Sequence, residues 1–380
     1  MDFRRSWSIG GFLIAAVGCS AALGSGALPG RSSAPPRTQH PPVAAAGKRA
    51  GGDAGVRASR IKPVKQPPFI SMGLALNRRG QALIMYLTAP PPIPDGPEHY
   101  GVVSGGQFTP ITGPPGEVLL AADINDAGQV VGASSGAHAF VWAAGKTRLL
   151  PGLPGAEQTV AGSINDSGEI AGESKFGPLG SESRATLWSG GRVIALGPAD
   201  RDSSASAVNN RGQVAGWVAD KKGRRRAVLW DRAGRMRDLG TFGGDTSQAY
   251  SLNDSGVVVG YAETRGGVLR AFVWRDGKMA AIGPAGGSSA AIGVSRNGTV
   301  CGDSGDFGGV NGRTFIWHAG RTTMLLQPRG APVSVVMRIN DLDQAIGTVT
   351  FMNPTAVRAA IWSRGKMRII QFRIPQRRMG

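Results

Sequence analysis

One pattern of apolar and polar residues returns seven times along the chain. Each copy resembles INDAGQVVG, in which an apolar residue and a polar turn precede a short apolar run. The copies lie at 76–84, 124–132, 164–172, 208–216, 252–260, 294–302 and 339–347. Their leading polar residues are spaced 40 to 48 residues apart, which is typical of a repeat protein built from one small structural unit.

A second phrase keeps the same period. AFVW, ATLW, AVLW, TFIW and AAIW each end on a tryptophan, and six of the eight tryptophans of the chain fall in this phrase. They are Trp142, Trp188, Trp230, Trp274, Trp317 and Trp362. Val103 takes the place of the tryptophan in the first repeat, which is the most degenerate. We expect the periodic tryptophans to fill the space between neighbouring units.

Each repeat divides into four short apolar segments separated by turn sequences. Around 252–260, AYSLN precedes the N-D-x-G turn, VVVGYA follows it, and RAFVW and KMAAIG flank a W-x-x-G turn. Four antiparallel strands at this period form a propeller blade. We therefore predict an all-β chain whose residues 68–375 form a seven-bladed β-propeller, or a six-bladed one if the first repeat does not form a blade.

The two phrases together resemble a known family. I-N-D-x-G-x-x-x-G followed by His138-Ala139-Phe140-Val141-Trp142 is similar to the HAF-repeat proteins, which are probable extracellular repeat proteins of bacteria. The resemblance covers residues 70–370, although the histidine itself is not repeated in this chain. It implies an exported protein and implies no known chemistry.

The N-terminal segment has the order of an export signal. In residues 1–28, Arg4 and Arg5 precede an apolar run from Ile9 to Val17 and then small residues. Cys19 ends a sequence that looks like a lipoprotein cleavage box, so lipid attachment to the membrane is an alternative to plain cleavage. Residues 29–67, rich in Pro, Ala and Arg, predict a disordered linker. The expected location is extracellular, periplasmic or on the outer surface of a bacterial cell.

Composition and charge agree with short strands and many turns. The chain of 380 residues has 59 Gly, 25 Pro and only 18% charged residues. Its net charge of +18 lies mostly in the tails, because residues 1–67 carry +8 and residues 364–380 carry +6, including a basic tail at 376–380. The repeats between them are nearly balanced, which weakens a nucleic-acid-binding interpretation.

The polar turn residues are interpreted as structural. Asn and Asp cap tight turns with their own side chains, and Gly accepts a positive φ. A calcium-binding interpretation is less favoured, because only the Asn-Asp pair recurs and a calcium loop needs more oxygen ligands. These turn residues are Asn125, Asp126, Gly128, Asn165, Asp166, Gly168, Asn209, Gly212, Asn253, Asp254, Gly256, Asn340 and Asp341.

Candidate chemistry is otherwise scarce. The four histidines are scattered, and no spacing resembles a zinc site or a Ser/His/Asp arrangement. We predict no catalytic residues, no cofactor and no metal. Cys301 stands where other repeats carry small apolar residues, so a buried structural role is expected.

The loops between the second and third strands differ in length and chemistry, and variable loops on a rigid scaffold commonly carry recognition. The strongest local feature among them is a basic run that could contact an anionic group, or could simply be a solvated loop tip. It consists of Lys221, Lys222, Arg224, Arg225 and Arg226.

The sequence therefore favours a non-catalytic binding or scaffolding protein, exported and monomeric, with an unknown extracellular ligand such as an anionic glycan or surface component. A propeller enzyme acting on polysaccharide is the alternative. Binding of nucleic acid or another polyanion through basic loops and tails is the third hypothesis.

Overall fold

The computed structural model describes residues 70–87, 98–305, 312–325, 330–331, 333–352 and 355–373. The predicted export signal with Cys19, the linker at 29–67 and the basic tail at 376–380 lie outside the described residues. Within the described part, no helix is both long and apolar enough to cross a membrane.

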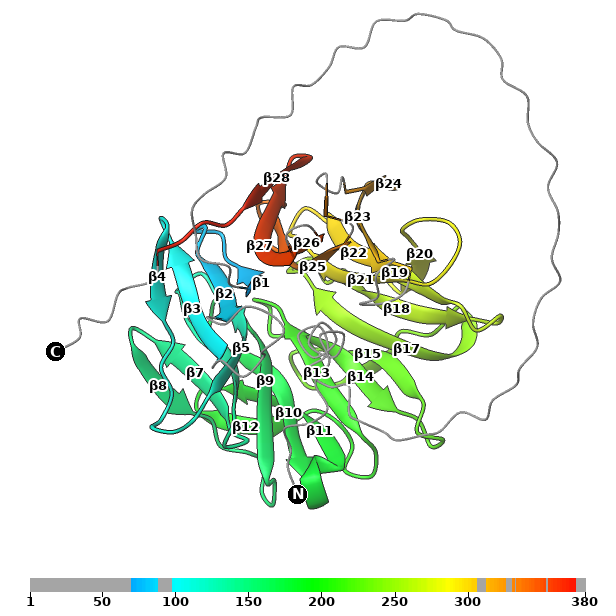
Figure 1. The fold of residues 1–380 in the computed structure, drawn as a ribbon. Coiled ribbons are helices and arrows are strands. Elements are labelled where there is room, and N and C mark those ends of the chain that lie inside the picture. Colours follow the sequence, from blue (N-terminus) through cyan, green and yellow to red (C-terminus); the bar gives the residue numbers. More distant parts are fainter. Residues whose placement is uncertain are drawn as a thin grey trace, which may run out of the picture. The chain divides into compact units, whose positions relative to one another are not determined.

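The described chain forms seven antiparallel sheets of four strands, each built from strands consecutive in sequence (Figure 1). Blades 1 to 3 consist of β1 (Ile70–Leu76), β2 (Ala82–Leu87), β3 (Glu98–Ser104) and β4 (Gln107–Pro110); β5 (Leu119–Ile124), β6 (Val130–Ser134), β7 (Ala139–Ala143) and β8 (Lys146–Leu149); and β9 (Gln158–Ile164), β10 (Ile170–Phe176), β11 (Glu182–Ser189) and β12 (Arg192–Ala195). A single turn of 3-10 helix, η1 (Pro178–Gly180), lies between β10 and β11.

Blades 4 to 7 repeat the same order. They consist of β13 (Ser203–Val208), β14 (Val214–Ala219), β15 (Arg225–Trp230) and β16 (Met236–Asp238); β17 (Gly243–Leu252), β18 (Val258–Thr264), β19 (Leu269–Arg275) and β20 (Lys278–Ala281); β21 (Ser289–Val294), β22 (Val300–Ser304), β23 (Arg313–His318) and β24 (Arg321–Met324); and β25 (Val333–Ile339), β26 (Ala345–Met352), β27 (Thr355–Ser363) and β28 (Lys366–Ile369).

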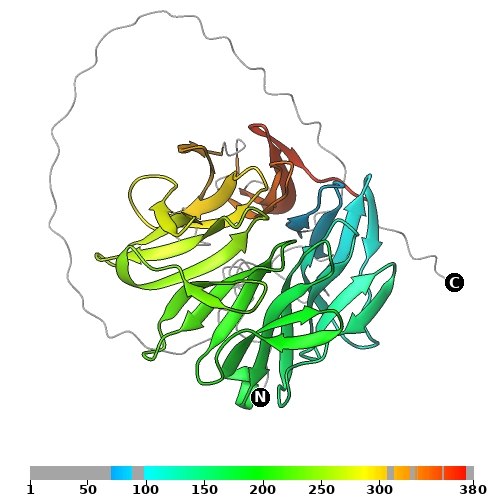
Figure 2. The same cartoon turned by 180° about the vertical axis from the view of Figure 1, so that it is seen from behind.

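The first strand of each blade lies innermost, around a common axis (Figures 1 and 2). Each innermost strand contacts the innermost strand of the next blade, and β25 of blade 7 contacts β1 of blade 1, so the ring is closed. The prediction of a seven-bladed β-propeller is confirmed, and the degenerate first repeat forms a complete blade.

Every innermost strand carries a β-bulge at the same place, three residues before the polar turn. In blade 4 the pairing register steps past Ser206. The bulged strand approaches the second strand so closely that a Cβ added to Gly216 would lie 2.0 Å from the carbonyl oxygen of Ser204. This contact explains the last glycine of the repeat phrase, which only blade 1 lacks.

Blade 1 packs its strands equally closely, but here the large residue lies on the second strand and the glycines lie on its two neighbours. Ile84 occupies the position of that glycine, and its neighbours on both sides are glycines, Gly73 in β1 and Gly101 in β3. The space beside Gly101 is filled by the ring of Phe108, whose Cζ would lie 2.2 Å from a Cβ at that position. The first repeat therefore places a large residue between two glycines, where blade 4 places Gly216 between Ala205 and Val228.

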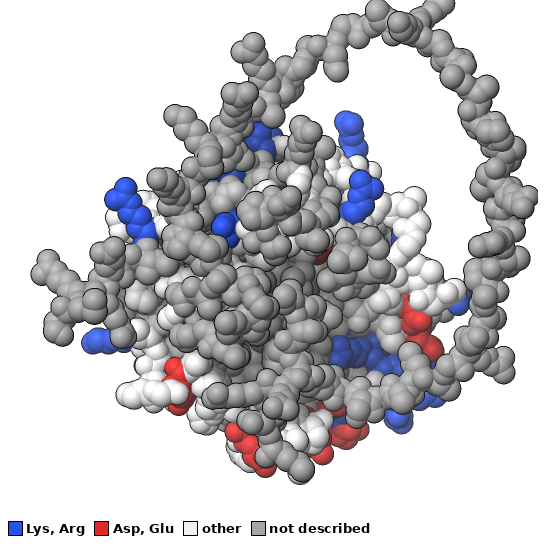
Figure 3. All heavy atoms as spheres, in the orientation of Figure 1, with Lys and Arg blue, Asp and Glu red and all other residues white. Residues whose placement is uncertain are grey.

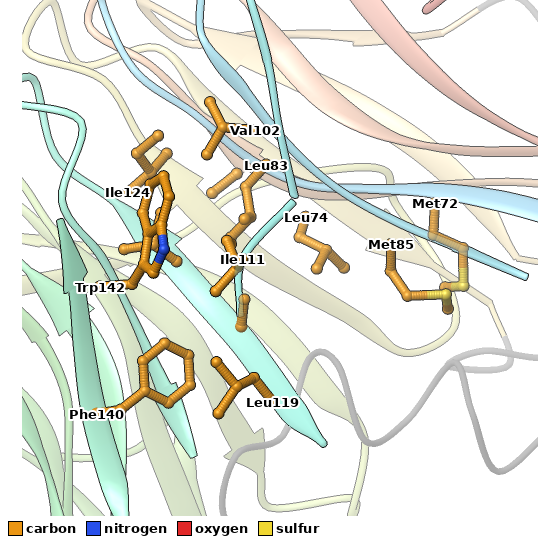
Figure 4. Close-up of a cluster of buried hydrophobic side chains, with 13 residues drawn as sticks. Met72, Leu74, Leu83, Met85, Val102, Ile111, Leu119, Ile124, Phe140 and Trp142 are labelled. Atoms are coloured by element: carbon orange, nitrogen blue, oxygen red, sulfur yellow. The ribbon is translucent and has the colours of Figure 1, made fainter. Parts of the chain in front are cut away.

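Apolar clusters fill the gaps between blades. Figure 4 shows one of them at the junction of blades 1 and 2, in which Trp142 of β7 lies beside Ile124 and Phe140 lies beside Leu119. Five of the six periodic tryptophans are buried, as expected for side chains that fill these gaps, and Trp317 is half-buried. The buried five are Trp142, Trp188, Trp230, Trp274 and Trp362.

The ring closes between blades 7 and 1 without a shared sheet. Beyond β28 the chain crosses to the outer strand of blade 1, where Arg373 N–H donates to the carbonyl oxygen of Gly106 at 3.0 Å. Phe372 is 5% exposed and stacks on Phe108 with the ring centres 5.5 Å apart. The two ends of the propeller are therefore held by side-chain packing and a few hydrogen bonds.

Candidate functional site

A polar cavity of about 180 Å³ lies on the axis of the ring, at the end that carries the polar turns. Its wall consists of the last residues of the innermost strands and the turn residues that follow them, contributed by all seven blades. We call this cavity the channel, and we call the end of the ring on which the polar turns lie the turn face. The opposite end carries the variable loops.

The turn asparagines tie each blade to the next. In six blades the asparagine Nδ2 donates to the main-chain oxygen at the start of the next turn, over 2.9 to 3.1 Å. The donors are Asn77, Asn125, Asn165, Asn209, Asn253 and Asn340, and the last of them reaches Asn77 and closes the circle. Since these side chains are buried, their amide groups need partners, and the partners come from neighbouring blades.

The same asparagines also cap their own turns. Asn209 Oδ1 accepts the main-chain N–H groups of Arg211 and Gln213, at 3.1 and 2.9 Å. Its Nδ2 also donates to Oε1 of Gln213 at 2.9 Å. The Gln or Glu four residues after the turn asparagine recurs in five blades and binds it in this way.

Blade 6 departs from this pattern, because Ser295 replaces the asparagine and its side chain cannot reach the next blade in the same way. Instead, Asp343 of blade 7 accepts the hydroxyl of Ser295 and the amide of Asn297. At the junction between blades 6 and 7 the linking side chain is thus a carboxylate from the later blade, whereas at the other junctions it is an asparagine from the earlier blade.

A second link between blades was not anticipated from the sequence. A Ser or Thr near the start of an innermost strand accepts the N–H of the alanine that opens the A-F-x-W phrase in the preceding blade, at 2.7 to 3.1 Å. The acceptors are Thr159, Ser203, Ser247, Ser289 and Ser71. A Ser or Thr stands six residues before the turn position in six of the seven repeats, and this recurrence is the signal that could have revealed the link.

The turn aspartates do not cap their own turns as expected. Each uses Oδ1 to accept the N–H of the equivalent residue in the preceding blade; Asp166 accepts that of Asp126 at 3.0 Å, and Asp254 accepts that of Asn210 at 2.8 Å. Asp126 and Asp341 do the same for Arg78 and Arg296.

These residues form an arc of linked side chains at the mouth of the channel, from Arg78 in blade 1 to Asp341 in blade 7. Arg78 pairs with Asp126 and Asp166, and Arg296 lies 3.8 and 3.6 Å from Asp254 and Asp341. The amide of Asn210 joins Asp166 to Asp254. Four aspartates against two arginines leave the mouth with a net negative charge, which favours neutral or cationic groups over polyanions.

Three large polar side chains stand in the channel wall at positions where other blades carry different residues. At the second residue before the turn position, the strands carry Asp123 and Arg338 in blades 2 and 7, against Ala, Ser or Gly in the other five. At the third residue, Tyr250 of blade 5 also lines the channel. Burial raises the pKa of the Asp123 carboxyl, although Arg338 and the N–H groups of Ile164 and Ile124 act in the opposite direction.

The basic loop lies at the opposite end of the ring, and most of its charge has partners within the protein. Arg224 pairs with Asp220 and Asp245, Arg226 pairs with Asp238, and the Arg225 guanidinium lies 4.5 Å from the ring centre of Trp217. Lys221 and Lys222 are exposed. In the space-filling view, basic side chains stand at separate points around the rim, and some lie directly beside acidic ones (Figure 3).

Other titratable groups are part of the packing. Cys301 is fully buried, and burial raises the pKa of its thiol to about 12. His318 Nδ1 lies 2.9 Å from the hydroxyl of Thr299. Within the described part of the chain, no group of three or more His, Cys, Asp or Glu side chains is placed to hold a metal ion.

Comparisons with known proteins bear on the fold. No family model matches the sequence, and no curated protein matches it significantly. Among solved structures, a puromycin hydrolase is similar with a TM-score of 0.57 at 14% identity, over 82% of this chain and 55% of the hydrolase. The β-propeller domain of the Trilobed protease from Pyrococcus furiosus has a TM-score of 0.53 at 9% identity, over 79% of this chain and 98% of that domain.

An oligogalacturonate lyase in complex with manganese also has a TM-score of 0.53, at 12% identity, over 78% of this chain and 90% of the lyase. The chain spans about half the length of the puromycin hydrolase that it matches. At these identities the comparisons show a shared propeller fold.

The asparagine links predict a specific stability effect. Asn209→Ala removes two donated and two accepted hydrogen bonds at a buried position, so we expect it to lower the free energy of unfolding by about 2 to 3 kcal/mol. The control is Asn210→Ala, which removes an exposed residue of the same type and should cost less than about 1 kcal/mol. Urea denaturation measures both, and equal losses would contradict a special role for the buried asparagine.

The buried Asp303 carboxyl predicts that the stability of the fold depends on pH. It accepts the hydroxyl of Thr314 at 3.0 Å and the N–H of Val336 in blade 7, and burial raises its pKa to about 7. Because the folded state keeps a proton that the unfolded state loses, stability should fall as pH rises from about 4 to about 7.

Asp303→Asn should abolish this decline and raise stability at pH 8 by on the order of 2 to 4 kcal/mol. Asp238→Asn removes an exposed ion-pair partner and should leave the decline in place. Thermal unfolding at pH 4 to 8 provides the measurement, and a decline that persists in Asp303→Asn would refute the assignment to this residue.

Proposed function

We propose that this protein is a non-catalytic binding or scaffolding propeller outside the cytoplasm, and that its ligand enters the channel from the turn face. The observation that carries this proposal is that six of the seven blades contribute polar residues to the wall of one axial cavity, which blade 6 completes with Val294. A closed ring holds these groups at fixed separations, which lowers the cost of ordering a site when a ligand binds.

The contacts of the acidic groups favour binding over catalysis. Asp126, Asp166, Asp254 and Asp341 are all engaged in links between blades, where a proton-transferring carboxylate would need a free oxygen toward the substrate. A propeller enzyme acting on polysaccharide is the second candidate. It is favoured by the position of the Asp123 carboxyl in the channel wall, where burial raises its pKa in the direction that a general acid requires.

Nucleic-acid binding is the weaker candidate. Arg224, Arg225 and Arg226 have partners within the protein, and the mouth of the channel is net negative. A stripe of free basic side chains, which a phosphate backbone requires, is not formed by this loop.

Export is proposed from the N-terminal residues 1–28 and from the resemblance to the HAF-repeat proteins, with Cys19 as a site of lipid attachment if the lipoprotein box is used. Fractionation of native cells and determination of the mature N-terminus test this. We expect a shortened chain outside the cytoplasm, and a full-length cytoplasmic chain would refute export.

The channel itself can be tested by filling it. Ser206 lines the channel at the bulge of blade 4, so Ser206→Phe should block it and abolish glycan binding without unfolding the ring. The control is the double change Lys221→Ala and Lys222→Ala at the opposite end, which should leave binding unchanged. An array of neutral and acidic glycans, with binding and product formation both recorded, measures the effect.

Binding without turnover supports the proposal, and turnover would support the enzyme alternative. Binding lost in the double lysine variant but kept in Ser206→Phe would move the site to the loop face. Absence of binding to every glycan on the array would refute the proposal for glycans.

A further inference from the structure

Two blades break the repeat at the same position of the channel wall. The second residue before the turn position is Ala75, Ser163, Ala207, Ser251 and Gly293 in five blades. In the other two it is Asp123 and Arg338, and both line the channel. The small residues at this position are explained by the packing of the ring. The two opposite charges in blades 2 and 7 are not explained by that packing.

The two charged side chains differ in how many of their hydrogen-bonding groups have partners. Asp123 accepts the N–H groups of Ile124 and Ile164 at 3.0 and 3.1 Å, so its carboxylate already links blades 2 and 3. Arg338 donates from Nη1 to the carbonyl oxygen of Met337 at 3.1 Å. It has no other hydrogen-bond partner among the described residues, although a guanidinium offers five N–H donors.

Arg338 and Asp123 do not neutralise each other directly. They form no ion pair within 4.0 Å, although the charge of Arg338 is close enough to lower the pKa of the Asp123 carboxyl. The guanidinium is half-buried in a polar cavity, where an anion would gain strong, charge-assisted hydrogen bonds.

The channel also restricts what that anion can be. Its volume of about 180 Å³ is below the usual range for drug-sized ligands, so the bound group is small. The net negative mouth repels a ligand with several negative charges. Hydroxyl groups of Ser163, Ser206 and Ser251 line the same cavity and match the hydroxyls of a polar ligand.

We propose that the channel binds a small hydroxylated monocarboxylate of the sugar-acid class, with its carboxylate on Arg338 and its hydroxyl groups toward Asp123 and the channel serines. This inference rests on the proposed binding function of the channel and names its ligand class. A free sugar acid and the acidic end of a glycan share this chemistry.

The test is isothermal titration of the purified full chain with D-glucuronate and with D-glucose, which lacks the carboxylate. We expect glucuronate to bind at least tenfold more tightly than glucose. Arg338→Met should weaken glucuronate binding roughly ten- to hundredfold, as expected for hydrogen bonds to a charged group, and leave glucose binding unchanged. The control Lys222→Met removes the same charge from the opposite end and should leave both affinities unchanged.

Arg338→Lys is a second variant that distinguishes loss of binding from a folding defect, because lysine keeps the positive charge but lacks the planar guanidinium group. It should bind glucuronate with an affinity between those of the native chain and Arg338→Met, at an unchanged melting temperature. An acidic oligosaccharide that binds where free glucuronate does not would place the carboxylate at a glycan end.

Three results would overturn the inference: no binding of either acidic probe, equal affinity for glucose and glucuronate, or native affinity in Arg338→Met. If neutral glycans still bind in a manner sensitive to Ser206→Phe, the proposed function stands and only the ligand class fails. If nothing binds in the channel, both fail.

Discussion

The structure depends on the hydrogen bond that a buried asparagine amide donates to the neighbouring blade. An amide buried at a turn must satisfy both Nδ2 hydrogens and its oxygen, and the local turn uses only part of that capacity. The remaining donor is satisfied by the next blade, at 3.0 Å for Asn209 and Asn253 O. The same bond recurs at six of the seven junctions, up to the one from Asn340 to Asn77, and at the junction of blades 6 and 7 Asp343 binds Ser295 instead. Individually such bonds contribute about 1 kcal/mol, but each also fixes the spacing between blades.

The sequence predicts the elements of each blade because they depend on contacts within one repeat. The Trp142 phrase, the polar turn and the spacing of apolar residues are local, and they were enough for seven four-stranded sheets. The partner of Asp166 could not be predicted in the same way, because it lies 40 residues away in the preceding blade and the aspartate equally suits a local cap. The links made by Ser203 and its equivalents were missed for the same reason, although their recurrence was visible.

The candidate site is harder to predict from the sequence than the fold, because its residues do not stand out within a single repeat. The most basic of the variable loops contains Arg224, Arg225 and Arg226, and their charges have partners within the protein. Asp123 and Arg338 are ordinary residues when the chain is read along its length. They stand out only when the blades are superposed, since both then occupy a position that the other blades keep small. In a closed ring that position faces the axis, which no single repeat reveals.

The placement of these two residues relates ligand binding to ring closure. Blades 7 and 1 are the last and first in sequence, and their junction relies on hydrogen bonds of Asn340, Ser71 and Arg373 and on the packing of Phe372. Arg338 lies two residues before Asn340 in blade 7, and Asp123 lies in blade 2, on the far side of blade 1. A ligand held between them would span blade 1 and its junction with blade 7, where the last blade of the ring meets the first. Binding there would therefore stabilise the ring where covalent connectivity does not, because a ligand that binds only the closed form shifts the equilibrium toward it.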